Sequence, residues 1–210
     1  MIKWETMIVG DLQTNCYLVW DEDSKKGIII DPGEDGQGIA EEIQNKQIKP
    51  IGVVLTHGHF DHCLAALDLK LIFGIPIYLN SDDEFLLKRQ DETAKYFLGV
   101  KNTPPNIVKI DKDLKDIKTI ELGNQIIEVI QTPGHTPGSI CLYSKENNIL
   151  FSGDTIFRGE RGRTDFKYGS TKKIFESIKK LMNLPENTDV LSGHGEITNI
   201  GTEKSRYGLS

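Results

Sequence analysis

Short apolar runs separated by polar turns recur along the whole chain. Runs that are rich in Ile, Val and aromatic residues and bounded by Gly, Pro, Asn or Asp predict β-strands. Two pairs of runs are joined by Gly123-Asn124 and by Asn147-Asn148, which predicts two β-hairpins. We predict strands over residues 2–9, 15–20, 27–31, 51–55, 75–79, 118–122, 125–131, 139–144, 149–152 and 189–191.

Other stretches place apolar residues three or four positions apart, as in a helix that buries one face. They predict helices over residues 39–47, 62–73, 81–89 and 170–181, and Ser81 is a plausible N-cap for the third. Residues 101–106, with Pro104-Pro105, predict a loop. We interpret Asp31-Pro32-Gly33 as a plain turn after a strand.

The order of these elements predicts the fold class. Strands are followed by helices twice along the chain, which indicates an α+β fold with two sheets face to face, helices outside and a site along the shared sheet edge. A doubly wound parallel sheet would also fit the strand–helix–strand stretches, but the N-terminal run of strands and the two late hairpins argue against it. With 210 residues and 23.6 kDa, residues 1–210 are expected to form one domain.

The composition narrows the class of function. Hydrophobic residues make up 38% and charged residues 27% of the chain, and the net charge of -6 with a pI near 5.4 disfavours nucleic-acid binding. The N-terminus lacks the apolar segment of a signal peptide, and no run approaches the roughly 20 apolar residues of a membrane helix, so we expect a cytoplasmic protein. The three cysteines are widely separated, which argues against disulfides and a zinc ribbon, and we expect Cys63 to be a buried helix residue.

The most informative stretch follows the predicted strand at 51–55 and reads Thr56-His57-Gly58-His59-Phe60-Asp61-His62. In extended backbone, side chains at i and i+2 lie on the same face, so His57 and His59 can point together off the strand end. Asp61 and His62 fall where the helical pattern begins and can face a second point. Imidazole and carboxylate groups suit zinc, iron or manganese, so one strand end could serve two ions.

Taken singly, these residues have simpler explanations. Asp61 alone would be an ordinary helix N-cap, and a single histidine is more often exposed or hydrogen-bonded than a ligand. Their close spacing directly after a strand favours a metal site. The remaining histidines, His135 and His194, also lie in glycine-flanked loops, and Asp154 follows another apolar run.

The sequence resembles the metallo-β-lactamase-fold hydrolases, and most closely the short bacterial glyoxalase II-like (hydroxyacylglutathione hydrolase-like) proteins. The resemblance lies in motifs that occur in the family's order: Thr56-His57-Gly58-His59-Phe60-Asp61-His62, Gly134-His135-Thr136-Pro137-Gly138, Ser152-Gly153-Asp154 and Gly193-His194-Gly195. It implies a four-layer αββα sandwich with a metal site at one edge of the two sheets. It also implies two divalent cations, most often zinc, with iron or manganese as alternatives. One cation would be held by His57, His59 and His135, and the other by Asp61, His62 and His194. Asp154 would bridge the two.

The resemblance further implies a hydrolase for a small thioester, such as a 2-hydroxyacyl thioester. Two cations would share a water whose pKa falls from ~15.7 towards ~7, and one would polarise the substrate carbonyl. Asp61 would have a catalytic role by orienting the hydroxide. A thiolate leaves readily because its thiol pKa is about 8.5, and the sequence has no further histidine to protonate an amine. Lactones and activated esters remain alternative substrates.

Other functions on the same fold compete with this one. Gly162-Arg163-Thr164-Asp165-Phe166 also resembles a stretch of the persulfide (sulfur) dioxygenases, in which the equivalents of His57, of His135 or a near neighbour, and of Asp154 hold a single iron. Gly193-His194-Gly195 is more similar to the hydrolase branch. Asp154 weighs against a β-lactamase, and the intact ligand set weighs against a non-enzymatic relic.

Substrate contacts are expected from the glycine-rich loop after Asp154, from Arg161, Arg163 and Tyr168. The arginines could pair with a substrate carboxylate, although Arg163 could instead bond Asp165 and hold the loop. Long glyoxalase II enzymes have a C-terminal helical extension with cationic glutathione-binding residues, for which this sequence ends too early, and Ser139 stands where the family has histidine. The acyl group, thiol carrier, native metal and oligomeric state are therefore not predicted.

Overall fold

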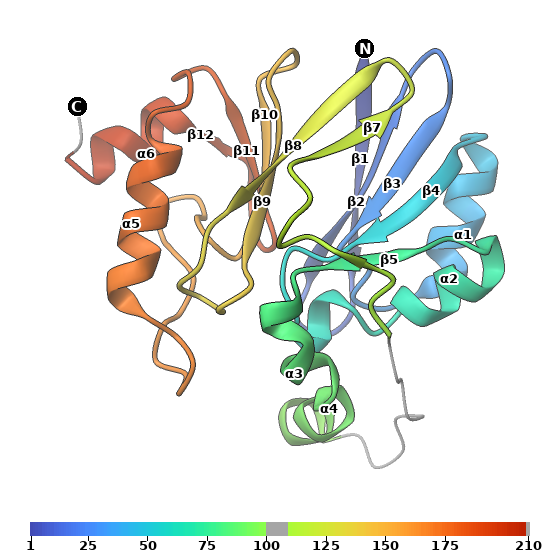
Figure 1. The fold of residues 1–210 in the computed structure, drawn as a ribbon, viewed down its shortest axis with the longest axis horizontal. Coiled ribbons are helices and arrows are strands. Elements are labelled where there is room, and N and C mark those ends of the chain that lie inside the picture. Colours follow the sequence, from blue (N-terminus) through green and yellow to red (C-terminus); the bar gives the residue numbers. More distant parts are fainter. Residues whose placement is uncertain (100–108, 209–210) are drawn as a thin grey trace.

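Two six-stranded sheets form the centre of the molecule in a computed structural model that describes residues 1–99 and 109–208 (Figure 1). The first sheet contains, in spatial order, β1 (Ile2–Val9), β2 (Thr14–Asp21), β3 (Lys26–Ile30), β4 (Lys49–Val54), β5 (Ile77–Leu79) and β6 (Lys112–Asp113). The second contains, in spatial order, β12 (Thr198–Asn199), β11 (Asp189–Ser192), β10 (Ile149–Gly153), β9 (Ile140–Ser144), β8 (Gln125–Gln131) and β7 (Thr119–Leu122).

The pairing of the strands brings several carboxyl ends to one edge. In the first sheet β1, β2 and β3 are antiparallel, whereas β3, β4, β5 and β6 run parallel. In the second sheet β7 to β10 are antiparallel, and β10 is parallel to β11. Parallel neighbours end at the same edge, so the loops after β3 and β4, and those after β10 and β11, lie together.

Helices cover the outer face of each sheet (Figure 1). Helices α1 (Gly36–Asn45) and α2 (Ala66–Phe73) pack on the first sheet, and α5 (Thr171–Leu181) and α6 (Ile200–Arg206) on the second. The predicted α+β fold, a four-layer αββα sandwich, is therefore confirmed. Near the site lie the 3-10 turns η1 (Phe60–His62) and η2 (Ser81–Asp83) and the short helices α3 (Glu84–Leu87) and α4 (Gln90–Leu98).

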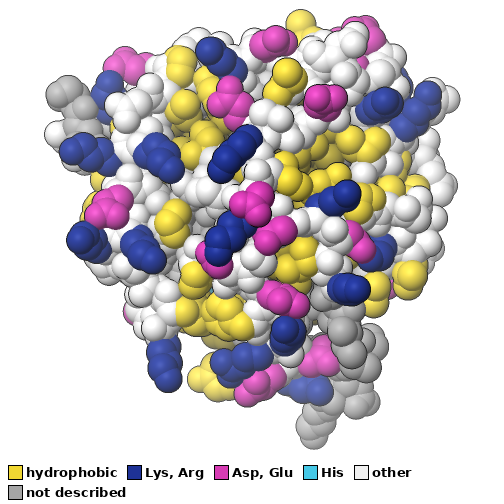
Figure 2. Space-filling model, viewed as in Figure 1, with side chains coloured by type: hydrophobic (Ala, Val, Ile, Leu, Met, Phe, Trp, Pro, Cys, Tyr) yellow, Lys and Arg dark blue, Asp and Glu magenta, His cyan; other side chains and the backbone are white. Residues whose placement is uncertain are grey.

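The core has three apolar layers because the central strands are buried on both faces. All residues of β2 are buried, and Tyr17, Val19 and Phe151 lie between the two sheets. On the outer faces Ile39 of α1 packs on the first sheet, and Ile174 of α5 packs on the second. Charged side chains of both signs are interspersed on the face in Figure 2, where no histidine is visible.

Most predicted elements agree with the structure to within a few residues, and the differences have local causes. The helix predicted over 62–73 begins as α2 at Ala66, after the η1 turn. The helix predicted over 81–89 divides into η2 and α3, because Asn80 rather than Ser81 accepts a cap hydrogen bond, from Asp82 N. Helices α4 and α6 were not predicted, and the loop predicted over 101–106 lies outside the described residues.

None of the helices in the described part of the chain combines the length and apolarity that a bilayer-spanning segment needs. The longest of them is α5, with 11 residues, and its exposed face carries lysines. A membrane helix needs about 20 apolar residues to cross the hydrocarbon layer.

Candidate metal centre

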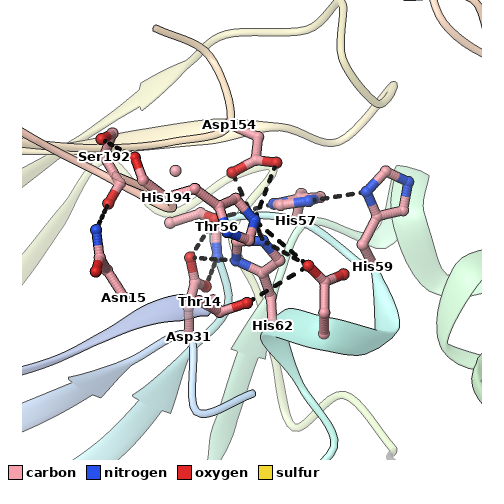
Figure 3. Close-up of polar contacts among 12 residues, drawn as sticks. Thr14, Asn15, Asp31, Thr56, His57, His59, His62, Asp154, Ser192 and His194 are labelled. Carbon is pink, nitrogen blue, oxygen red and sulfur yellow. Dashed lines mark hydrogen bonds and ion pairs between the residues drawn. The ribbon is translucent and has the colours of Figure 1, made fainter. Parts of the chain in front are cut away.

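All side chains predicted to bind metal meet at the shared edge of the two sheets, and Figure 3 shows five of them, His57, His59, His62, Asp154 and His194. The turn after β4 supplies His57, His59, Asp61 and His62, whereas the β8–β9, β10 and β11 loops supply His135, Asp154 and His194 respectively. All of these residues except Asp154 belong to compact groups, and the donor atoms within each group lie within 4.8 Å of one another. A further group of this kind contains Asp31 with His57 and His62. Sequence reasoning therefore identified residues that the fold brings together.

The first group consists of His57, His59 and His135. The Nδ1 atom of His59 lies 3.1 Å from Nε2 of His57 and 3.0 Å from Nε2 of His135. Zinc ligands at 2.0–2.1 Å in a tetrahedral arrangement lie roughly 3.3 Å apart. These nitrogens thus have the spacing of ligands around one cation.

The second group consists of Asp61, His62 and His194. Nε2 of His194 lies 3.2 Å from Nε2 of His62 and 3.4 Å from Oδ2 of Asp61, and the His62 Nε2 to Asp61 Oδ2 distance is 3.5 Å. This group has the same ligand spacing as the first. The cluster as a whole suggests two metal ions.

Asp154 lies between the two groups. Its Oδ2 is 3.6 Å from Nε2 of His135 in the first group, and its Oδ1 is 3.5 Å from Nε2 of His62 in the second. Oδ1 is buried and has no hydrogen-bond partner among the described residues. A Cβ at Gly193 would lie 2.3 Å from this oxygen, so only glycine leaves it room. A buried, unpaired carboxylate oxygen is unfavourable unless a cation neutralises it, so the residues present fit a bridged pair of cations.

Each imidazole has a hydrogen-bond partner at its outward nitrogen, so in the neutral form of the ring the inward nitrogen is available to a metal. The outward partners are Thr56 Oγ1 for His57 (3.1 Å), Tyr168 Oη for His59 (2.8 Å), Asp31 Oδ2 for His62 (3.1 Å), the Arg163 carbonyl for His135 (2.8 Å) and the Leu12 carbonyl for His194 (3.1 Å). The site is thus preorganised by side chains and backbone of several loops.

Asp31 is part of this support, so the interpretation of Asp31-Pro32-Gly33 as a plain turn is wrong. The Asp31 carboxylate is buried and accepts hydrogen bonds from Thr56 N at 2.7 Å and from Thr56 Oγ1 at 2.6 Å, besides the one from His62 (Figure 3). Its φ of 50° lies in the left-handed region, which aspartate tolerates better than most residues. The signal in the sequence was its position directly after a buried strand, like that of the ligands.

Asp83 is a second support that the sequence did not reveal. This buried carboxylate accepts hydrogen bonds from Gly58 N (3.0 Å), Gly138 N (2.7 Å) and Thr136 Oγ1 (2.6 Å). It therefore joins the loop of His57 and His59 to the loop of His135. Neither loop alone predicts this partner, because Asp83 lies in the irregular segment after β5.

Replacing Asp83 with asparagine is expected to weaken metal binding at the first group by about 10- to 100-fold, the usual effect of losing such a support. An amide accepts at only one oxygen, and its NH2 group would face a backbone N–H. Titration of the metal-free protein with zinc against a chelator of known affinity measures the change. Asp82→Asn is the matched control, because exposed Asp82 pairs with Lys115. Equal affinities for both variants would contradict the role given to Asp83.

The electrostatics of the site also favour cations. Burial and the neighbouring histidines lower the pKa of His57 well below its usual value and that of His59 to about 3, so both imidazoles are neutral. At His62 burial also disfavours the charged form, but the carboxylates of Asp61, Asp154 and Asp31 outweigh it and raise the pKa to about 10. Positive charge is therefore stabilised where the second group lies.

The predicted substrate contacts line one open cavity of about 550 Å³ beside Asp154. Arg163 donates two hydrogen bonds to Asp165, of 3.0 and 2.8 Å, which agrees with the alternative prediction that it bonds Asp165 and holds the loop. The Arg161 guanidinium lies 5.0 Å above the Phe175 ring. Tyr168 lines the cavity, and its hydroxyl oxygen lies 2.8 Å from Nε2 of His59.

Cys63 is buried, as predicted, but it follows the η1 turn instead of lying within a helix. Its Sγ donates to the His59 carbonyl at 2.8 Å and accepts a hydrogen bond from the Gln90 amide. The thiol therefore supports the loop from behind and faces away from the candidate cations. Burial raises the pKa of this thiol well above its usual value, which keeps it protonated.

Comparisons with known proteins agree with this geometry. The profile of the Metallo-beta-lactamase superfamily matches residues 9–194. The chain is 37% identical over 205 residues to the hydroxyacylglutathione hydrolase GloC of Haemophilus influenzae, and the alignment covers 95% of this chain and 94% of that protein.

Crystal structures of two similar proteins share the whole fold. The BLEG-1 B3 metallo-beta-lactamase superposes with a TM-score of 0.89 at 34% identity, covering 97% of each chain. TTHA1623 in a di-iron-bound form superposes with a TM-score of 0.84 at 33% identity, covering 95% of this chain and 96% of that one. The match to the profile and the similarity along the whole length show that the chain belongs to the metallo-β-lactamase superfamily of metallo-hydrolases.

Proposed function

We propose that this protein is a metal-dependent hydrolase of small thioesters, similar in activity to glyoxalase II, and that residues 1–210 act as one domain. The observation that carries the proposal is the carboxylate of Asp154, which lies between two groups of candidate ligands and whose buried Oδ1 has no hydrogen-bond partner among the described residues. The similarity to hydroxyacylglutathione hydrolase GloC over nearly the whole length supports the choice of a thioester. We also propose that the protein is located in the cytoplasm.

We assign one cation to His57, His59 and His135 and a second to Asp61, His62 and His194, with Asp154 as the bridge. When bound, the two cations supply hydroxide at neutral pH and polarise the carbonyl group of the substrate. Zinc suits the nitrogen-rich first group, and the di-iron form of TTHA1623 supports iron as the other candidate.

The chain's own residues then orient the reactants. The Asp61 carboxylate, which accepts a hydrogen bond from Thr14 Oγ1 at 3.4 Å, would orient the attacking water as a catalytic residue. Burial raises the pKa of Tyr168 to about 12, so its hydroxyl stays protonated. With metal bound at Nδ1, the His59 Nε2–H would donate a hydrogen bond to the Tyr168 hydroxyl oxygen, which leaves that hydroxyl free to donate its own hydrogen to a substrate oxygen or sulfur.

Among the cavity arginines, Arg161 is the stronger candidate for a substrate contact. Arg163 already pairs with Asp165, whereas no carboxylate of the described residues pairs with Arg161. The thiolate that leaves needs no strong general acid, since its conjugate thiol has a pKa of about 8.5. A thioester therefore fits a site whose histidines are all committed to the cluster better than an amide does.

Purified protein tests the proposal directly. We expect close to two metal ions per chain by elemental analysis and hydrolysis of S-lactoylglutathione or a simpler acyl thioester. Exhaustive chelation should abolish the hydrolysis, and zinc or iron should restore it. Oxygen uptake with a persulfide substrate is measured on the same sample. One iron per chain, oxygen consumption and no thioester hydrolysis would favour the mononuclear-iron dioxygenase instead.

A further inference from the structure

We propose that the thioester cleaved here carries an uncharged, apolar acyl group, aromatic or branched, rather than a small polar one. This inference rests on the proposed thioester hydrolysis and names its substrate class. It follows from the aromatic walls of the cavity beside Asp154 and from the pairing of charges at its rim.

Aromatic rings make up much of the cavity wall. The apolar and aromatic side chains that line it are Leu12, Phe60, Phe97, Phe157, Phe166 and Tyr168. They form two stacked pairs, Phe60 with Phe97 at 5.9 Å between ring centroids and Phe166 with Tyr168 at 5.4 Å. Phe60 is buried and Phe97 is half-exposed, so the first pair presents an apolar surface that a ligand can cover.

The rings stand on two sides of the ligand cluster. The Phe166 ring lies 5.2 Å from that of His59 and 5.9 Å from that of His135. On the other side, the Phe157 ring lies 6.3 Å from that of His194. The reacting carbonyl must reach the cluster, so its acyl group lies against an aromatic ring in either orientation of the substrate.

Most of the charges at the rim are paired. Arg158 pairs with Glu196 and Arg163 with Asp165, and Glu160 lines the same cavity as Arg161. Of these three arginines, only Arg161 has no carboxylate partner among the described residues. A carrier with two carboxylates, such as glutathione, would find at most one unpaired arginine there, whereas an uncharged substrate breaks none of these ion pairs.

A preference between matched substrates follows. S-phenylacetyl-N-acetylcysteamine and S-acetyl-N-acetylcysteamine have the same leaving group and differ only by the ring. We expect kcat/KM to be roughly 10- to 100-fold higher for the phenylacetyl compound, the range expected when a pocket buries one apolar side group. S-lactoylglutathione should be the poorest of the three.

The outcomes separate the two proposals. Hydrolysis of none of the thioesters would overturn the proposed function. Hydrolysis in which the acetyl or lactoylglutathione compound matches or exceeds the phenylacetyl compound would leave thioester hydrolysis intact and overturn the apolar acyl group.

Phe97→Ala tests the wall itself, because Phe97 lies on α4 and its ring contacts those of Phe60 and Tyr96. We expect a loss of about 10-fold in kcat/KM for the phenylacetyl compound and little change for the acetyl compound. Leu71→Ala on α2 is the control, since this leucine is exposed and does not line the cavity. Equal losses on both compounds would contradict the inference.

A binding measurement gives a readout independent of turnover. The thioether N-acetyl-S-(2-phenylethyl)cysteamine lacks the reactive carbonyl but keeps the ring. Calorimetric titration should show binding about 10-fold weaker for Phe97→Ala than for the native chain and for Leu71→Ala. Identical affinities in all three proteins would overturn the assignment of this wall to the acyl group.

Discussion

Asp154→Ala is expected to reduce the metal content from two ions to one or fewer per chain and to lower kcat/KM for thioester hydrolysis by at least about 10²- to 10³-fold. The physical reason is the position of this carboxylate, which contacts both ligand groups: Oδ1 lies 3.5 Å from His62 Nε2, and Oδ2 lies 3.6 Å from His135 Nε2 and 3.8 Å from His194 Nε2. Without it, two cations would repel each other across the site. Elemental analysis after dialysis and steady-state kinetics at fixed zinc concentration measure the two effects.

The control for this variant is Asp165→Ala, in the same loop but exposed and paired with Arg163. It should keep both ions and most of the activity. Asp154→Asn preserves the shape of the side chain while removing its charge, so it guards against a folding defect. Two tightly bound ions and native activity in Asp154→Asn and Asp154→Ala would show that this carboxylate does not bridge.

Asp31→Ala is expected to lower the melting temperature by on the order of 10 °C. The substitution leaves the Thr56 backbone N–H, the Thr56 hydroxyl and His62 Nδ1 without their buried acceptor. Removing one partner of a buried charged network costs about 3–5 kcal/mol, and each kcal/mol shifts the melting temperature of a domain of this size by about 2–4 °C. Calorimetry of the metal-free protein measures the change without a contribution from bound ions.

Metal binding provides a second readout for the same residue. Zinc affinity at the group that contains His62 should fall by roughly 10- to 100-fold, because this imidazole loses the partner that orients it. Asp35→Ala is the comparison, since Asp35 caps α1 at the surface and its loss costs only about 1 kcal/mol. A thermal shift no larger than that of Asp35→Ala would contradict a supporting role for Asp31.

The histidines and aspartates near the ends of predicted strands indicated a metal site, and the resemblance to the metallo-β-lactamase-fold hydrolases supplied the two candidate groups. Within each sheet, parallel neighbours such as β3 and β4, or β10 and β11, end at the same edge. The packing of one sheet on the other, which no local pattern encodes, then brings His62 and His194 together. Local patterns also predict the hairpins after β7 and β9, since Gly123-Asn124 and Asn147-Asn148 are strong turn signals.

The supporting residues were harder to predict because their partners are distant in sequence. Asp83 accepts a hydrogen bond from Thr136, which lies in a loop of the second sheet. Tyr168 contacts His59 because the loop after Asp154 lies over the site. Helix α4 has a polar sequence and few buried residues, so its pattern is weak. The aromatic wall to which Phe97 of α4 contributes was therefore missed as well.

Ligands from both sheets take part in each candidate group. His57 and His59 follow β4 of the first sheet, whereas His135 belongs to the second, and Asp61 and His62 likewise face His194 across the same boundary. An ion in either group would therefore cross-link the two halves of the sandwich. The binding free energy of each ion would then add to the free energy of unfolding of the whole chain, so the stability of the fold would depend on the concentration of free metal.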